Sequence, residues 1–321
     1  MWGTNTSLEH RKSVQSENDD HFTFEYSVLC REYDYRMILW ALFCLALMLI
    51  GSLESHAQKI SEESRPALGE VFGTGELTLT TGAILGLGLL SVWGEEWIGP
   101  KGSSMGIPSE GSVDLRFSRW SNPHFDPKAQ WLGGTPDLAG YAAPVLGLAY
   151  YIGGSVLGER GQAYGAHPHE AIAFTQGLSW AMFTTTLLKR IVGRERPYIA
   201  RGKLNELDAS AVEMSRSEQL LSFPSGHSTA IAATSFFVAA DLSDALVSGP
   251  LRSRSAFEQA FLGRVLPYLT ASGLSWMVMY SRIKDQRHWL SDTLTGATIG
   301  AFSALLSYHM HFDRQGAPRE R

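Results

Sequence analysis

Three short runs of this sequence carry residue types that can bind a tetrahedral oxyanion and do chemistry on it. The first run reads K-R-I-V-G-R-E-R-P and places Lys189 and Arg196 seven residues apart, with Pro197 directly after them. Seven residues are about two turns of a helix, so both cations can point into one pocket. Because a guanidinium presents paired N–H donors that match phosphate oxygens, this run predicts one wall of an anion site.

The second run, S-F-P-S-G-H-S-T, contains Pro224, Ser225, Gly226 and His227 at the start of an apolar stretch. A helix that begins there presents free backbone N–H groups and the positive end of its dipole to an anion. Gly226 has no side chain that would keep an oxyanion away. His227 can protonate a leaving oxygen and afterwards activate water. The run therefore predicts an anion cradle with an acid–base group beside it.

The third run, S-R-I-K-D-Q-R-H-W-L-S-D, contains Ser281, Arg282, His288 and Asp292. Arg282 adds a third cation. His288 and Asp292 are four residues apart, so on a helix the carboxylate can hold the imidazole in one tautomer and stabilise its cationic form. A histidine held in this way can attack phosphorus and form a phosphohistidine. No Asp or Glu cluster of metal-ligand character accompanies the runs, so we expect the cations to supply the charge stabilisation.

Six apolar segments are expected to position these runs, at about 77–94, 138–158, 170–189, 227–242, 259–281 and 289–308. Their length and their Ala, Leu, Gly and Met content predict helices, and therefore an all-α, six-helix bundle. The first run ends the third segment, the second begins the fourth, and the third joins the fifth to the sixth. Since neighbouring helices with short connections alternate in direction, all three runs should meet at one end of the bundle.

At these residues the sequence resembles the type 2 phosphatidic acid phosphatase (PAP2) superfamily, which includes class A acid phosphatases and vanadium haloperoxidases. The family pattern is K-x6-R-P, P-S-G-H and S-R-x5-H-x3-D, and this chain matches it without departure. The resemblance implies a nucleophile at His288 and an acid at His227. It also implies a set of phosphate-binding residues: Lys189, Arg196, Ser225, Gly226 and Arg282.

The resemblance implies metal-independent hydrolysis of phosphomonoesters or lipid phosphates, for example phosphatidic acid, a polyprenyl pyrophosphate or a lipid A phosphate. No cofactor is expected, and vanadate should inhibit. One alternative is a haloperoxidase with vanadate as its cofactor, although members of that branch are usually much larger. A second alternative is a non-catalytic polytopic membrane protein with a relic site. Inhibition by vanadate of a phosphatase activity would exclude the relic.

The composition and the N-terminal region bear on partners and location. The chain has 321 residues and a net charge of -5, which gives no indication of a nucleic-acid partner. From Met37 a run of about fifteen apolar residues is followed by S-L-E-S-H-A before Gln58, as in a signal peptide or a short N-terminal anchor. The 36 residues before it are unusual for a signal, and a translation start at Met37 would explain them. Both cysteines, Cys30 and Cys44, precede residue 57.

We therefore expect four parts: an extension with a signal peptide or anchor at 1–57, a linker at 58–76, a PAP2 domain at 77–310 and a polar tail at 311–321. The protein should be exported, and either periplasmic or membrane-associated with its site facing outward. Segments 77–94 and 138–158 contain no charged residue and could span a bilayer, whereas Arg264 interrupts the fifth segment. The mean hydropathy of -0.07 is low for six spans. A soluble bundle and a polytopic protein both remain open.

Overall fold

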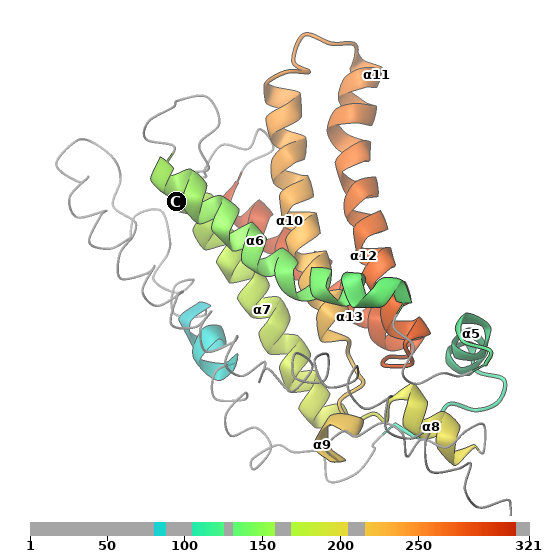
Figure 1. Cartoon of the computed structure of the whole chain (residues 1–321). Helices are drawn as coiled ribbons and strands as arrows, with labels where there is room; N and C mark the ends of the chain where they lie inside the picture. The colour runs from blue at the N-terminus through green and yellow to red at the C-terminus, as the bar shows by residue number, and fades with distance from the viewer. Residues whose placement is uncertain (1–79, 88–104, 125–130, 158–167, 205–215, 313–321) are drawn as a thin grey trace, which may run out of the picture. The chain divides into compact units, whose positions relative to one another are not determined.

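A computed structural model describes residues 80–87, 105–124, 131–157, 168–204 and 216–312 (Figure 1). The predicted signal peptide or anchor, the linker and most of the polar tail lie outside these residues. The boundaries proposed for the 77–310 domain stay a prediction.

Regular structure in the described ranges is helical throughout, which confirms the all-α prediction. Each of the six apolar segments falls in a helical stretch, although only residues 80–87 of the first are described. The remaining elements are α5 (Val113–Ser121), η1 (Trp131–Gly134), α6 (Thr135–Leu157), α7 (Pro168–Val192), α8 (Pro197–Lys203), α9 (Arg216–Gln219), α10 (Gly226–Ser248), α11 (Ala256–Glu258), η4 (Gln259–Val265), α12 (Leu266–Lys284) and α13 (Leu290–His311). The short helices α5, α8 and α9 were not predicted, because they lie in the polar connections.

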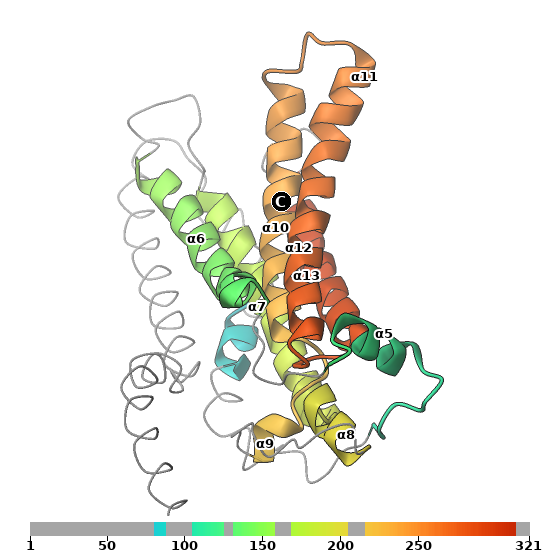
Figure 2. The ribbon, with the colours of Figure 1, turned by 45° about the vertical axis from the view of Figure 1, so that its right-hand side comes forward.

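Helix α10 is the central helix, with α6, α7, α12 and α13 packed around it (Figure 2). Its closest neighbour is α13, because two glycines let the backbones approach each other. A methyl group added at Gly296 or Gly300 of α13 would overlap the carbonyl oxygen of Ser225 or Thr229. At the same crossing the Ser225 amide donates a hydrogen bond of 3.0 Å to the carbonyl of Asp292. The glycines thus bring the second and third runs into contact.

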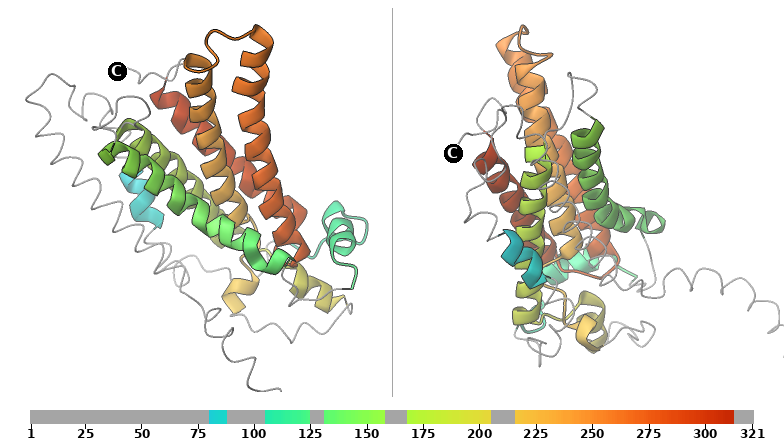
Figure 3. Two further views of the ribbon diagram at one scale, coloured as in Figure 1. Left: turned by 45° about the horizontal axis from the view of Figure 1, so that its top comes forward. Right: turned by 90° about the vertical axis from the view of Figure 1, so that its left-hand side faces the viewer.

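The ends of four helices meet at one end of the bundle, as the alternation of directions predicted (Figures 1 and 3). These are the C-terminal ends of α7 and α12 and the N-terminal ends of α10 and α13. Hydrogen bonds tie the connecting segments together there. The Lys189 ammonium at the end of α7 donates to the Leu221 carbonyl at 2.7 Å. All three chemistry-bearing runs therefore lie at this end.

Of the helices in the described ranges, α10 is the one long and apolar enough to cross a membrane. More than half of its apolar window, 56%, is buried against the rest of the protein. The core helix of a soluble bundle has the same length and composition, so α10 by itself favours neither the soluble nor the membrane-spanning alternative.

Candidate active site

Two cations from the first run lie close enough to affect each other's charge, and both side chains are half-buried. Lys189 is in the last turn of α7, and Arg196 is the N-cap residue of α8. The Arg196 Nε donates to the Glu218 carbonyl at 2.9 Å. Burial and the neighbouring Arg196 lower the pKa of Lys189 to about 7, and burial lowers the pKa of Arg196 to about 10. Neighbouring cations and burial make the protonated form of each group less favourable. A bound anion would make the protonated form favourable again.

Arg282 brings the third predicted cation to the same place from the last turn of α12. Its Nη1 forms an ion pair with Asp137 in the first turn of α6, and the Ser281 hydroxyl donates to the same carboxylate at 3.3 Å. The Arg282 Nε is buried and has no hydrogen-bond partner among the residues that the structure describes. One edge of the guanidinium is thus anchored, while the Nε remains available to a ligand.

The second run begins α10 as predicted, with Ser225 as its N-cap. The Ser225 hydroxyl accepts from the Ser228 amide at 3.4 Å and from the Ser228 hydroxyl at 2.9 Å. Gly226 lies against the first run, because a methyl group added to it would contact Cε of Lys189 at 3.7 Å. The structure therefore places Ser225 and Gly226 beside the cations. Their direct contact with a phosphate stays a prediction.

His227 occupies the first turn of α10 and packs under the start of α6. The rings of Tyr141 and His227 meet edge to face, with centroids 4.2 Å apart. A methyl group on Gly140 would lie 3.0 Å from Cδ2 of His227, which leaves no room between the helices. The His227 Nε2 is buried and lacks a hydrogen-bond partner in the described part of the chain. Burial and the nearby Arg282 lower its pKa well below the usual range.

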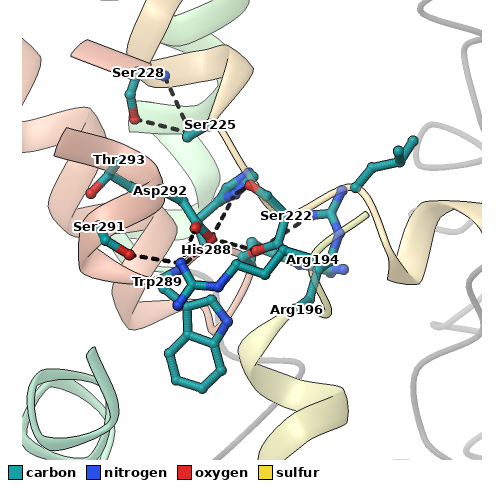
Figure 4. Close-up of polar contacts among 12 residues, drawn as sticks. Arg194, Arg196, Ser222, Ser225, Ser228, His288, Trp289, Ser291, Asp292 and Thr293 are labelled. Atoms are coloured by element: carbon teal, nitrogen blue, oxygen red, sulfur yellow. Dashed lines mark hydrogen bonds and ion pairs between the residues drawn. The ribbon is translucent and has the colours of Figure 1, made fainter. Parts of the chain in front are cut away.

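His288, the predicted nucleophile, is 2% exposed and held by one short hydrogen bond (Figure 4). Its Nδ1 lies 2.7 Å from the backbone carbonyl oxygen of Ser222. A carbonyl only accepts, so Nδ1 must carry a proton, and in the neutral ring Nε2 then carries the lone pair. Burial and the cations, Lys189 first among them, lower the pKa of His288 well below its usual range. The ring is therefore neutral, as a nucleophile must be.

The prediction that Asp292 bonds directly to His288 is wrong. The Asp292 Oδ2 lies 3.9 Å from the His288 Nδ1, which is too far for a hydrogen bond. The prediction assumed that both residues lie on one helix, but α13 begins only at Leu290. Asp292 instead folds back over the helix end, where its Oδ2 accepts from the Trp289 amide at 2.9 Å. The i, i+4 spacing therefore does not place the carboxylate on the ring.

The Asp292 carboxylate has two further partners (Figure 4). Its Oδ2 accepts from the Ser222 hydroxyl and its Oδ1 accepts from Nη1 of Arg194, each at 2.5 Å. Burial raises the pKa of Asp292, and Arg194 and the hydrogen bonds from Ser222 and Trp289 oppose that shift. Asp292 is thus the centre of a buried network next to the nucleophile.

Comparison with known proteins concerns the part of the chain that contains the three runs. Residues 171–316 match the model of the PAP2 superfamily. This segment belongs to the PAP2 superfamily. All three runs lie inside it, and membership indicates a phosphatase. A search of curated proteins finds no match. The crystal structure of Aquifex aeolicus LpxE aligns with a TM-score of 0.35 and 15% identity, over 63% of this chain and 98% of that chain.

Several residues at this PAP2 site were not predicted as site residues. Asp137, Gly140 and Tyr141 come from α6, outside the matched segment, and nothing in their spacing marks them. Asp114 of α5 accepts from Nη2 of Arg194 at 2.7 Å, and its other oxygen accepts from the Ser291 amide at 2.8 Å. Asp114 lies in a polar connection with no apolar period, so only the packing of α5 reveals it.

Ser222 and Arg194 carried a weak signal in the sequence. Ser222 lies three residues before Ser225 in the second run, and Arg194 lies between the two cations of the first run. Both were close to predicted site residues, but Arg194 could equally have been a solvated basic residue at a helix end. Its burial, at 5% exposed, excludes that interpretation.

Proposed function

We propose that this chain is a metal-independent phosphatase that hydrolyses phosphomonoesters or lipid phosphates through a phosphohistidine on His288. The observation that carries the proposal is the hydrogen bond of 2.7 Å between the His288 Nδ1 and the Ser222 carbonyl. This bond leaves the Nε2 lone pair free for attack in a site that holds three cations. An unprotonated imidazole beside a group of cations suits attack on an anionic phosphorus centre.

In the first step the phosphate group binds among Lys189, Arg196 and Arg282. The His288 Nε2 attacks phosphorus, so that an N–P bond forms while the bond to the leaving oxygen breaks. His227, whose Nε2 has no partner within the described ranges, donates a proton to that oxygen. Burial and then the nearby cations lower the pKa of His227 in the empty site, and a bound phosphate dianion offsets the part that is due to the cations.

In the second step the neutral His227 takes a proton from water, and the oxygen of that water attacks phosphorus. The N–P bond breaks, inorganic phosphate leaves, and both histidines return to their starting states. Through both steps the cations stabilise the charge on the equatorial oxygens, as Mg²⁺ does in other phosphoryl-transfer enzymes. Vanadate, which adopts a five-coordinate geometry, should therefore inhibit.

We further propose that the enzyme is exported and membrane-associated, with its site facing outward, and that it acts on a phosphorylated amphiphile. Large apolar side chains exposed on three helices support the membrane association. Leu146 of α6, Leu269 of α12 and Phe302 of α13 are 67%, 57% and 66% exposed. Where such side chains join into one patch, they are typical of contacts with lipid or with an apolar partner.

A phosphate-release assay tests the function directly. Purified protein in excess EDTA is offered phosphatidic acid, a polyprenyl pyrophosphate, a lipid A phosphate and a soluble aryl phosphate. We expect release from at least one of them, with no release by His288→Ala purified in parallel. Activity that disappears with EDTA and returns with Mg²⁺ would contradict the mechanism, and the absence of release from every substrate would contradict the function.

A further inference from the structure

All three polar groups of Ser222 are engaged, each by a different part of the site. Its amide donates to the Arg194 carbonyl at 3.0 Å. Its hydroxyl donates to the Asp292 carboxylate at 2.5 Å, and its carbonyl accepts from the His288 Nδ1 at 2.7 Å. Ser222 is fully buried. Ser222 thus bonds to both the carboxylate and the ring, whose Oδ2 and Nδ1 atoms lie 3.9 Å apart.

The position of Ser222 is fixed by a closed ring of bonds. Arg194 accepts from the Ser222 amide through its carbonyl and donates to Asp292 through Nη1. Asp292 in turn accepts from the Ser222 hydroxyl. Arg194 is itself held from outside the ring by Asp114, and its guanidinium lies 5.6 Å from the centre of the Trp289 ring. Charge-assisted bonds of this kind hold geometry better than neutral ones.

We propose that Ser222 is the positioning residue of the nucleophile and that Asp292 acts on His288 through it. This inference rests on the proposed function. When the Nε2 forms its bond to phosphorus and the leaving oxygen departs with a proton from His227, the His288 ring becomes cationic. The Nδ1–H bond to the Ser222 carbonyl strengthens as that charge develops, because the carbonyl oxygen is the negative end of a fixed dipole. The Asp292 carboxylate keeps the carbonyl aimed by holding the hydroxyl of the same residue.

The first experiment reads the tautomer of His288 without any substrate. Long-range ¹H–¹⁵N spectra of protein labelled in its histidines distinguish a protonated Nδ1 from a protonated Nε2. The His288 signals are those that disappear in His288→Gln. We expect wild-type His288 to be protonated on Nδ1, and Ser222→Ala to show a mixture of both tautomers. Ser275→Ala is the matched control, because it removes a buried hydroxyl that bonds to Ser235 rather than to the site.

The second experiment is a double-mutant cycle on turnover of an aryl phosphate. We expect Ser222→Ala to lower kcat about tenfold, because a displaced nucleophile loses its approach to phosphorus. If Asp292 acts through Ser222, the double variant Ser222→Ala/Asp292→Ala should lose no more than about twofold beyond Asp292→Ala alone. Losses that multiply would show that Asp292 reaches His288 by another route, and would overturn the proposal.

Two spectroscopic results would also overturn it. One is a wild-type His288 protonated on Nε2, a measurement that needs no variant. The other is a Ser222→Ala protein whose His288 signals match the wild type. If Ser222→Ala does not fold, Asp292→Ala replaces it, since the Ser222 hydroxyl then loses its acceptor and the same mixture should appear. A protein with the expected tautomer that releases no phosphate would contradict the proposed function and leave the positioning role intact.

Discussion

Asp137 and Arg282 form an ion pair that joins the first turn of α6 to the last turn of α12. The pair holds one edge of the guanidinium, while its Nε has no partner in the described part of the chain. Asp137 lies outside the segment that matches the superfamily model, residues 171–316. A carboxylate from α6 therefore sets the direction of a cation that belongs to the third run.

Replacing Asp137 by Ala should destabilise the empty enzyme and make it more responsive to phosphate. The change leaves Arg282 without its partner, at a cost of about 2 kcal/mol in the free energy of unfolding. The cost is below that of a fully buried pair, because the Asp137 side chain is 25% exposed. Inorganic phosphate would supply a new partner, so it should raise the stability of the variant more than that of the wild type. Urea unfolding with and without phosphate measures both effects, and equal responses would contradict this arrangement.

Arg282→Lys keeps the charge but loses the planar fork, so kcat/KM should fall about tenfold or more. Arg254→Lys is a suitable control, because Arg254 is exposed in the turn before α11. The comparison requires initial rates on the best substrate of the phosphate-release assay. Wild-type rates for Arg282→Lys would show that this guanidinium does not hold the phosphate.

Lys189→Met should stabilise the protein in a pH-dependent way. Folding lowers the pKa of Lys189 from 10.5 to about 7, so the folded state disfavours its charge. That cost is present in full below about pH 7 and disappears as the pH rises towards about 10.5. The variant should therefore exceed the wild type in free energy of unfolding at pH 6, and the gap should shrink towards pH 10.

Chemical unfolding in phosphate-free buffer at several pH values gives the comparison. Lys203→Met is the control, since its side chain is 54% exposed and paired with Glu195. A gap for Lys189→Met that stayed constant from pH 6 to pH 10 would mean that Lys189 is not the source of the effect.

Gly300→Ala tests the close crossing of α10 and α13. The new methyl group would overlap the Thr229 carbonyl, so we expect a loss of about 3 kcal/mol in stability and a loss of activity as the second and third runs separate. Gly273→Ala in α12 is the matched control, because a methyl group there meets no atom within 4 Å. That control should gain up to about 1 kcal/mol from helix propensity. Two variants of equal stability would argue against the crossing.

The two histidines should respond differently to the leaving group. His288→Ala should be inactive on every substrate, because it removes the covalent step. His227→Ala should still form the phosphohistidine from an aryl phosphate, whose leaving oxygen departs without a proton, but not from an alkyl or lipid phosphate. Because water attack also needs a base, the intermediate should accumulate in that variant.

Quenching at alkaline pH and peptide mapping should then locate acid-labile phosphate on His288. Label on His227, or on no histidine, would reverse or remove the assigned roles.

The sequence by itself determined the helical segments, and it predicted the main residues of the candidate site. The length and composition of the apolar runs predict the helices. The spacing that indicates a phosphate site can be read without knowing how the helices pack. It involves Lys189, Arg196, His227, Arg282 and His288. The direction in which successive helices run then placed the three runs at one end. These features are local or follow from short connections, so no long-range contact had to be known.

Only the tertiary structure decided which groups orient the reactive residues. The spacing of His288 and Asp292 suggested a direct bond, but a helix that begins at Leu290 turns the carboxylate to Ser222 instead. Asp114 and Asp137 come from α5 and α6, and their partners lie far away in the chain. A carboxylate in a first turn looks the same in sequence whether it faces water or a buried guanidinium. The docking of those two helices against the bundle makes the difference.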